Sequence, residues 1–395
     1  MDTFVMAFEQ TPEKSRCLIF DKKAKIISLA EQKISPCRHQ NGLIEYNANE
    51  IWDSQLLASQ TALRQANLRS ENIAAIGITG QRETIVLWNA ETGEPVYNAI
   101  DGDDIRCGHT VPAYKLRWLL QNVPGAAAQA LAGKLRFGTI GTWLLWKLTN
   151  GTAHAADSSL AVRTGLCNIV KSEWNQELLD RFSVPAGIMP EIFLSSHPYG
   201  KSAPEYFEGA IPVTGLAGLQ HSTFFGQTCY DLPALITILD KNCNVLLHTG
   251  TSPIFSRNGL ATTVSYGISG RPKYALEGNA FEGASGEEDL TPAKCDAIAA
   301  HMHSILAAMR ADIGSDPAPL KVSGPLSRSD VLLQKISDAI ELPVHRPVTA
   351  DVTALGAAYL AGVNVGYWTG RPDILPNWKL ERAFVPQASN HTRLN

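Results

Sequence analysis

Short apolar runs separated by polar turns fill the first hundred residues, and their spacing predicts strands. Three such runs follow one another with short connections, which is typical of an antiparallel meander. Asn47 is then a candidate N-cap with Glu50 three residues later, ahead of apolar residues at helical spacing. The predicted strands are Phe4–Phe8, Cys17–Phe20, Ile26–Ile34, Ile73–Ile78, Ile85–Trp88 and Pro95–Tyr97.

A second set of runs follows residue 212, where we expect a domain boundary just before the turn Gly215–Gln220. Thr353 is a candidate N-cap for the last helix, and Gly366 is its candidate stop. The predicted elements are strands at Val245–His248, Ala261–Tyr266, Pro272–Leu276, Leu320–Val322 and Val344–Arg346, and helices at Ala293–Ala311, Asp330–Ile340 and from Thr353.

The order of elements at the N-terminus is three strands, a helix and a strand. This is not the alternating order of a dinucleotide-binding fold. It is the order of ribonuclease-H-like domains, the type found in actin and hexokinase. We therefore predict an α/β protein with two ribonuclease-H-like domains, residues 1–212 and 213–395, around a central cleft.

Composition narrows the classes of partner. The 395 residues are 45% hydrophobic and 18% charged, with a net charge of −4. Lys and Arg are scattered, so we expect no nucleic-acid partner. No apolar run approaches the ~18 residues of a membrane span. The seven cysteines form no CxxC pair and the N-terminus has no secretory signal pattern, so we expect a cytoplasmic protein with reduced thiols.

Several motifs resemble the FGGY family of carbohydrate kinases, and within it the glycerol kinases. They occur in the family's order along nearly the whole chain. The matching segments are Ile73–Thr79, Gln81–Thr84, Val96–Ile100, Phe137–Thr139, Thr142–Leu144, Trp146–Lys147, Tyr274–Gly278 and Val352–Gly362. The resemblance implies MgATP as phosphoryl donor and a small polyol such as glycerol as acceptor.

The first phosphate loop of the family, Asp-x-Gly-Thr-Thr, corresponds here to Glu9–Lys14. Thr11 replaces the glycine, and Pro12 has no N–H to donate to a phosphate. Glu9 keeps a carboxylate as a weak candidate for Mg²⁺, and Lys14 is the one cation of the turn. We therefore expect this loop to be degenerate.

The second phosphate loop, Gly-Thr-Gly in the family, corresponds to Asp240-Lys241-Asn242 when counted back from Asn258. Thr249-Gly250-Thr251 resembles the motif more closely but has the wrong offset. A slip of one hairpin would make Thr249 and Gly250 the phosphate ligands instead.

The general base of the family lies in Gly-x-x-Gly-Asp-Gln, which is Gly215–Gln220 here, with Leu219 at the aspartate position. A leucine accepts no proton, and losing a positioned base costs about 10²–10⁴ in rate. His221 is the candidate substitute, since a neutral imidazole is a competent base. The alternative for His221 is an ordinary polar residue at a helix start.

The resemblance implies that Arg82 and Glu83, with Gln81 and Gln220, bind the polyol hydroxyls. The family's tryptophan corresponds to Gly102, and a following segment is shortened to His109–Pro112. Arg82 and Glu83 have the alternative role of a structural ion pair with each other at the end of a strand.

The nucleotide side also departs from the family. Its Asp-Gly-Gly turn corresponds to Ser323-Gly324-Pro325. A long Gly- and aromatic-rich segment is missing after Glu282–Ser285, so we expect the second domain to be truncated.

Two hypotheses follow. In the first, the chain is a catalytically impaired pseudokinase that binds a polyol or a partner and needs no cofactor. In the second, it is an active ATP-dependent glycerol or sugar kinase with relocated catalytic groups. Since family members often form oligomers, a homo-oligomer or a hetero-oligomer with an active relative is a further expectation.

Overall fold

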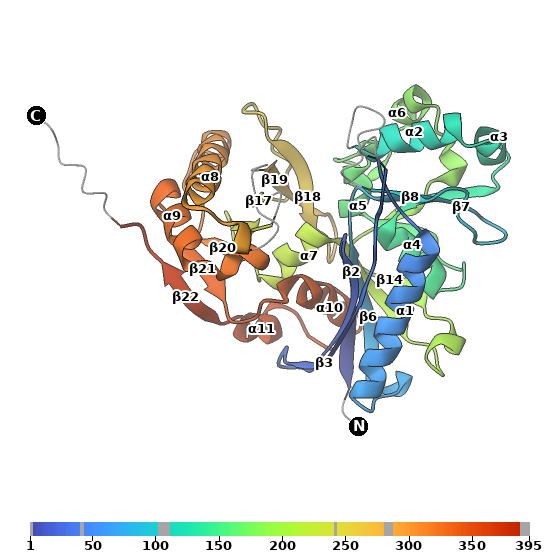
Figure 1. The fold of residues 1–395 in the computed structure, drawn as a ribbon, viewed down its shortest axis with the longest axis horizontal. Helices are drawn as coiled ribbons and strands as arrows, with labels where there is room; N and C mark the ends of the chain where they lie inside the picture. Colours follow the sequence, from blue (N-terminus) through green and yellow to red (C-terminus); the bar gives the residue numbers. More distant parts are fainter. Residues whose placement is uncertain (1–2, 40–42, 102–110, 241–242, 280–286, 388–395) are drawn as a thin grey trace, which may run out of the picture. The chain divides into compact units, whose positions relative to one another are not determined.

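The computed structural model of the chain describes residues 3–39, 43–101, 111–240, 243–279 and 287–387 (Figure 1). Contacts divide the chain into two compact units. Unit 1 comprises Met1–Ser222, Tyr266–Pro272 and Thr353–Asp373, and unit 2 comprises Thr223–Ser265, Lys273–Val352 and Ile374–Asn395. The division predicted at residue 212 stays a prediction, and each unit is an α/β structure as the sequence indicated.

Unit 1 is built on a six-stranded sheet of order β14-β15-β6-β1-β2-β3. The first three strands form the expected antiparallel meander, and β6 and β15 lie parallel to β1. The strands are β1 (Phe4–Gln10), β2 (Lys14–Phe20), β3 (Ile26–Lys33), β6 (Ile73–Gly80), β14 (Ser196–Lys201) and β15 (Pro212–Gly218).

Helix α1 covers one face of this sheet and begins where the sequence predicts (Figure 1). The Asn47 side chain accepts hydrogen bonds from the backbone N–H groups of Asn49 and Glu50, which satisfies two otherwise unpaired donors. The buried side of the helix includes Ile51 and Trp52. Its bounds are Ala48–Gln65.

Helix α10 (Val352–Asn364) packs against β6 and β15, and this close contact requires a glycine in each strand. A Cβ on Gly77 of β6 would lie 2.0 Å from the carbonyl oxygen of Ala357, and a Cβ on Gly215 of β15 would lie 2.7 Å from the N of Ala361. Only residues without a side chain allow this backbone approach. Since α10 begins at Val352, the prediction that Thr353 caps it is wrong by one or two residues.

A five-stranded sheet of order β4-β5-β8-β7-β9 packs on helices of unit 1. Its strands are β4 (Cys37–Arg38), β5 (Ile44–Tyr46), β7 (Ile85–Asn89), β8 (Ala99–Ile100) and β9 (Leu135–Thr139). The strand predicted at Pro95–Tyr97 is wrong, because this stretch makes only an isolated bridge between Pro95 and Trp88. A turn over residues 90–94 delays regular pairing until Ala99.

The other elements of unit 1 lie between β8 and β15, in a part of the chain where hydrophobic spacing gave few predictions. They are α2 (Pro112–Asn122), α3 (Ala126–Leu131), α4 (Ile140–Leu148), β10 (Ala155–Asp157), α5 (Ser158–Arg163), β11 (Cys167–Asn168), β12 (Glu173–Trp174), α6 (Gln176–Phe182) and β13 (Glu191–Phe193).

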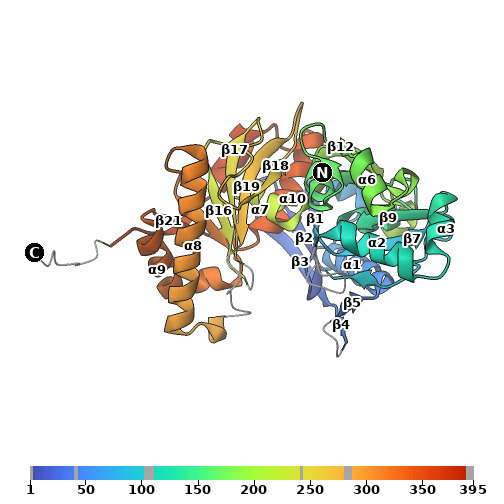
Figure 2. The same cartoon turned by 90° about the horizontal axis from the view of Figure 1, so that it is seen from above.

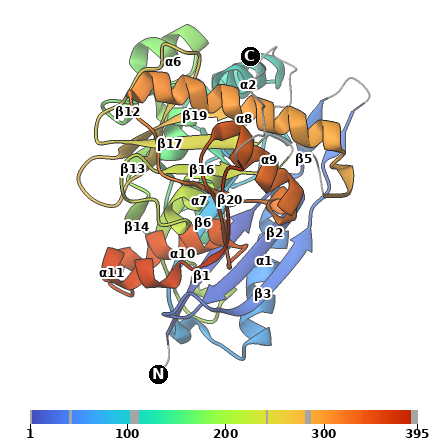
Figure 3. The ribbon, with the colours of Figure 1, turned by 90° about the vertical axis from the view of Figure 1, so that its left-hand side faces the viewer.

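Unit 2 is a seven-stranded sheet of order β18-β19-β17-β16-β20-β21-β22. Helices α8 (Pro292–Ile313) and α9 (Asp330–Ile340) lie side by side along it and bury its apolar face (Figures 2 and 3). The strands are β16 (Leu235–Ile238), β17 (Asn244–Gly250), β18 (Ala261–Tyr266), β19 (Lys273–Asn279), β20 (Leu320–Ser323), β21 (Val344–Pro347) and β22 (Leu380–Phe384).

Candidate functional site

The carboxyl ends of three parallel strands meet at one edge of the six-stranded sheet of unit 1. In the register of these strands, Glu9 of β1 pairs with Thr79 of β6, and Gly80 pairs with Gly218 of β15. The residues that follow the strands are therefore neighbours, and the edge they form is where open α/β sheets bind ligands. The sheet thus brings together three sequence-predicted segments: Glu9–Lys14, Gln81–Glu83 and Leu219–His221.

Arg82 and His221 both lie close to Gly218. A Cβ on Gly218 would lie 2.5 Å from Cγ of Arg82 and 3.2 Å from Nδ1 of His221. Both side chains are buried, with exposed fractions of 3% and 0%. The glycine therefore leaves the space in which a cation and an imidazole share one end of β15.

The amide of Gln81 makes its hydrogen bonds within the protein. Its Nε2 donates to Oε1 of Gln10 at 3.0 Å, and its Oε1 accepts from the hydroxyl of Thr84 at 2.7 Å. Gln10 in turn donates to the carbonyl of Thr11. Gln81 therefore fixes the end of β6 to the end of β1, while Gln220 is only half-buried.

Glu83 is paired with Arg163 of α5, which corrects the alternative in which Glu83 and Arg82 pair with each other. The backbone beside Glu83 is held by the fully buried Lys115, whose Nζ donates to the carbonyl of Glu83 at 3.4 Å and to that of Asp101 at 2.7 Å. The sequence analysis missed Arg163 because eighty residues separate it from Glu83.

Leu219 begins helix α7 (Leu219–Gly226) immediately after β15 and is half-buried. The sequence analysis places the family's general base at this position, and that assignment stays a prediction. The side chain carries no group that accepts a proton, and His221 lies within the same first turn of α7. The edge therefore holds one imidazole and no carboxylate in the segment Leu219–His221.

The buried carboxylate of Asp157 is linked through Ser159 to Gly218, at the end of β15. Ser159 accepts a hydrogen bond from the N–H of Gly218 at 3.1 Å and donates to Asp157 at 2.9 Å. Asp157 also accepts from the hydroxyl of Ser195 at 2.8 Å and caps α5 through the N–H of Leu160. Complete burial raises its pKa to about 6, although these hydrogen bonds oppose the shift.

The sequence analysis also missed Asp157. An Asp followed by two serines and an apolar run is a helix N-cap pattern that would have located it as a structural residue. Its link to Gly218 joins segments sixty residues apart and is visible only in the fold.

The β1–β2 turn is closed by its own hydrogen bonds. The N–H of Thr11 donates to the carbonyl of Lys14 at 2.9 Å, and the N–H of Lys14 donates to Oγ1 of Thr11 at 3.2 Å. Pro12 has no N–H. Of the four residues from Thr11 to Lys14, only Glu13 keeps a backbone N–H that these bonds do not use.

The charged candidates of this turn are paired within the sheet. Glu9 is 4% exposed, and its Oε2 lies 2.5 Å from the guanidinium of Arg16. Lys14 lies 2.8 Å from Glu31. A metal ion at Glu9 would therefore compete with Arg16 for the same carboxylate oxygen.

Two candidate nucleotide-side turns adjoin each other in unit 2. Strands β16 and β20 are parallel, with Ile238 opposite Ser323, and the N–H of Leu239 donates to the carbonyl of Ser323 at 2.8 Å. The turn after β16 therefore lies beside Gly324. Asp240 at this turn accepts from the N–H of Cys243 at 3.0 Å.

Gly324 has a left-handed backbone, with φ +90°. A Cβ at this position would lie 2.6 Å from the carbonyl oxygen of Leu239. A glycine is therefore required by the close packing of the two turns, whatever ligand they bind.

Thr249 and Gly250 lie at the far end of β17 from the β16–β17 turn, because Asn244 pairs with Ile238 beside the turn and Leu247 pairs with Leu235 at the other end. Gly250 has φ +98° and lies near Leu232. The structure therefore does not bring Thr249 and Gly250 together with Asp240 and Gly324.

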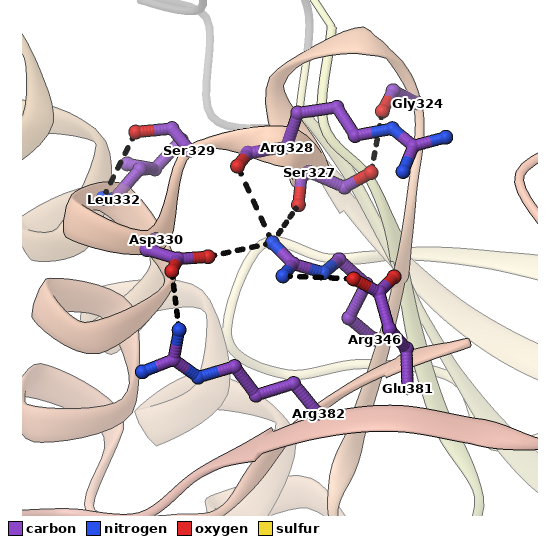
Figure 4. A network of polar contacts seen from close by, with 9 residues as sticks. All are labelled: Gly324, Ser327, Arg328, Ser329, Asp330, Leu332, Arg346, Glu381 and Arg382. Atoms are coloured by element: carbon purple, nitrogen blue, oxygen red, sulfur yellow. Dashed lines mark hydrogen bonds and ion pairs between the residues drawn. The ribbon is translucent and has the colours of Figure 1, made fainter. Parts of the chain in front are cut away.

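The helix that follows Gly324 is anchored by a polar network that the sequence analysis did not identify (Figure 4). Arg346 of β21 lies 2.8 Å from Asp330 and 3.1 Å from Glu381, and it also donates to the carbonyls of Ser327 and Arg328. A guanidinium suits this role because its donors form a fixed fork. The network holds the start of α9 and the Gly324 turn on β21.

Some sequence candidates lie outside the described residues: Gly102, His109, Lys241, Asn242 and the segment Glu282–Ser285. Within the described part of the chain, no group of three or more His, Cys, Asp or Glu side chains is placed to hold a metal ion. None of the described helices is long and apolar enough to span a membrane.

Comparison with known proteins agrees with the resemblance. The N-terminal domain model of the FGGY family of carbohydrate kinases matches residues 4–113 and 105–226, and its C-terminal domain model matches residues 275–365. This chain belongs to the FGGY family of carbohydrate kinases. It is 35% identical to a glycerol kinase of Geobacillus kaustophilus and 34% identical to one of Thermus thermophilus, and each alignment covers 100% of this chain and 96% of the relative.

Solved structures support the same fold for this FGGY protein. A glycerol kinase of Plasmodium falciparum, solved with ADP, matches with a TM-score of 0.89 at 23% identity, covering 98% of this chain and 94% of that one. A gluconate kinase of Lactobacillus acidophilus matches with a TM-score of 0.85 at 14% identity over the same shares. At these identities the likeness shows the two-domain fold, and the sequence relatives make the chain glycerol-kinase-like.

Proposed function

We propose that this FGGY protein is an ATP-dependent kinase that transfers a phosphoryl group to a hydroxyl of a small polyol such as glycerol, at a rate limited by Leu219. The observation that carries the proposal is similarity to glycerol kinases over the whole chain, combined with Arg82, Gln220 and His221 on one sheet edge. The proposed acceptor is a soluble polyol, the proposed phosphoryl donor is MgATP, and the proposed location is the cytoplasm.

Arg82 and Glu83 are the proposed ligands of the polyol hydroxyls, with Gln220 beside them. Charged hydrogen bonds to a neutral ligand contribute about 1.5–3 kcal/mol each. Arg163 holds the Glu83 carboxylate, and Gln81 fixes the strand end, so both act as positioning residues. We propose that MgATP phosphates approach the turns at Asp240 and Gly324 in unit 2, with Glu9 and Lys14 contributing little because each has a partner in the sheet.

In this reaction the acceptor oxygen attacks the terminal phosphorus of ATP, the bond from that phosphorus to the bridging oxygen breaks, and ADP leaves. The hydroxyl proton needs an acceptor. Leu219 offers none, so His221 or water must take it. Transfer through water without a positioned base is slower by about 10²–10⁴.

The test is formation of ADP in the presence of MgATP, with and without glycerol. We expect glycerol-dependent turnover that falls at least about tenfold in Arg82→Ala, since one charged hydrogen bond is lost. An equal rate with and without glycerol would contradict the proposal. The substitution Glu71→Gln, on an exposed position of unit 1, serves as the control.

A second candidate function is polyol or partner binding without turnover, and the β1–β2 turn favours it. The turn closes on itself through Thr11 and Lys14, so it offers few N–H groups to phosphate oxygens. Calorimetric titration with MgATP discriminates the two functions. Binding tighter than about 1 mM supports the kinase. No binding by the folded chain supports the binding module, in which a true kinase subunit would be the partner.

Both candidate functions, the kinase and the binding module, assume a second domain shorter than that of the relatives. The alignment with the Geobacillus enzyme runs over 478 positions, whereas this chain has 395 residues, so that relative contains internal segments without a counterpart here. We place the missing segment after Glu282–Ser285. A homo-oligomer, or a hetero-oligomer with an active relative, would cover the surface that the missing segment leaves.

A further inference from the structure

A cavity of about 510 Å³ opens on unit 1, lined by elements other than the carboxyl ends of β1, β6 and β15. It lies between the C-terminal part of α4, strand β10 and the neighbouring segment from β13 to β14. The residues that carry the argument below are Arg136, Trp146, His154, Glu191, Phe193 and His197. A cavity of this size is large enough for a sugar of one or two rings.

The cavity has a flat aromatic surface. The rings of Phe193 and His197 are stacked with centroids 4.0 Å apart and planes 8° from parallel. Both side chains are partly buried and line the cavity, and Tyr199 packs edge-on against both rings. A second aromatic wall is Trp146, held edge-on by His154 at 5.8 Å. Flat aromatic walls suit the apolar C–H face of a sugar ring.

The polar groups of the cavity carry opposite charges. Arg136 uses its Nη1 for the carbonyls of Gly133 and Leu135, which holds the guanidinium in place. Glu191 is exposed, at the start of β13. Both groups bind hydroxyls, the guanidinium as a donor and the carboxylate as an acceptor.

The imidazole of His154 adds a fixed acceptor. Its Nε2 lies 2.9 Å from the carbonyl of Phe137, so that nitrogen carries the hydrogen and Nδ1 accepts. Burial lowers the pKa of His154 to about 4, so the ring is neutral near pH 7. The cavity therefore offers donors from Arg136 and acceptors from Glu191 and His154, around an aromatic surface.

We propose that this cavity is a second binding site for a neutral polyhydroxylated ligand, a saccharide, distinct from the polyol site at the carboxyl edge of β6 and β15. Trp146 and Gly151 also line a smaller hollow of about 250 Å³, together with Thr92, Lys147 and Asn150. Because the two hollows share Trp146 and Gly151, we expect a disaccharide to bind better than a single ring.

The test uses ligand-observed NMR and calorimetry on the whole chain with D-glucose, maltose and inorganic phosphate as probes. We expect maltose to bind with a dissociation constant near or below about 1 mM, and phosphate not to bind at the cavity. Glu191→Gln changes an exposed side chain and His197→Ala a half-buried one, and each folded variant is expected to weaken maltose binding at least about tenfold. Glu71→Gln, an exposed change elsewhere on unit 1, should leave binding unchanged.

The site is independent of the proposed kinase function, and Arg82→Ala separates the two. Maltose binding that survives Arg82→Ala and is lost in Glu191→Gln supports the second site. Three results overturn it: no binding of either sugar, binding lost in Arg82→Ala but kept in Glu191→Gln, or binding of phosphate in preference to maltose.

Discussion

Among single residues, Gly218 determines how closely Arg82 and His221 pack at the carboxyl end of β15. Changing Gly218 to Ala would place a methyl group 2.5 Å from Cγ of Arg82, so the arginine must move. We expect overpacking to cost about 1–3 kcal/mol of stability and to weaken glycerol binding. Chemical denaturation and a glycerol titration measure the two effects.

Gly187→Ala is the matched control, because no atom of the described residues lies within 4 Å of the new methyl group and its backbone is not left-handed. Its stability and glycerol binding should match those of the wild type. If Gly218→Ala behaves like Gly187→Ala, the close packing of Arg82 on Gly218 has no role in the site.

Asp157 gives the stability a specific pH dependence. Its pKa rises from the ordinary 3.8 to about 6 in the folded protein, because burial disfavours the charged form. Between these pH values the folded state binds more protons than the unfolded state, so this group's stabilising contribution is present below about pH 4 and lost as the pH rises through about 6. The loss amounts to about 3 kcal/mol.

Asp157→Asn removes that titration and costs a constant amount at every pH. The deficit of the variant relative to the wild type should therefore shrink by about 3 kcal/mol between pH 4 and pH 7 in urea denaturation. A deficit that does not vary with pH would show that the Asp157 carboxyl does not titrate in this range.

Some residues of the candidate site could be predicted from the sequence and others could not. Arg82, Gln220 and His221 follow predicted strands and a motif, so their neighbourhood could be predicted. The partner of Glu83 could not, because Arg163 reaches it from a helix that no motif marks. Side-chain partners depend on which elements the fold brings together, and one sequence does not give that.

At the scale of elements, the Gly324 turn is a tightly packed connection of unit 2. Gly324→Ala adds a methyl group 2.6 Å from the Leu239 carbonyl oxygen in addition to left-handed strain. Gly314 is also left-handed, with φ +69°, and in the described part of the chain no atom lies within 4 Å of a Cβ built there. We expect Gly314→Ala to cost about 1 kcal/mol and Gly324→Ala clearly more.

Thermal unfolding of both variants measures this difference. Equal unfolding midpoints for the two variants would mean that the turns after β16 and β20 can move apart without loss of stability. The close packing of these turns would then not hold the proposed nucleotide site in place.

The strands and helices themselves were largely predictable. The meander, the Asn47 cap, β18 and α9 follow from apolar spacing and capping residues. The strand predicted at Pro95–Tyr97 was wrong because a turn intervenes before pairing resumes. Short elements such as β10 and β13 have three residues each and leave no periodic signal.

For the whole molecule, full-length similarity to glycerol kinases is observed, and departures from the family's motifs at Leu219 and Pro12 are predicted from the sequence. The two agree if the chain keeps the kinase reaction and lacks an efficient proton acceptor. In that account the missing proton acceptor at Leu219 limits the rate of the wild type. Restoring that group tests the whole account.

The deciding measurement is glycerol-dependent ADP formation by Leu219→Asp beside the wild type and Leu219→Asn. Leu219 is half-buried at the start of α7, and Asp and Asn are nearly equal in size, so the two variants differ mainly in the proton acceptor. We predict that Leu219→Asp raises the rate by about 10²–10⁴ and that Leu219→Asn, which accepts no proton, does not. If folded Leu219→Asp binds glycerol and MgATP but turns over no faster than Leu219→Asn, a missing base is not what limits this protein.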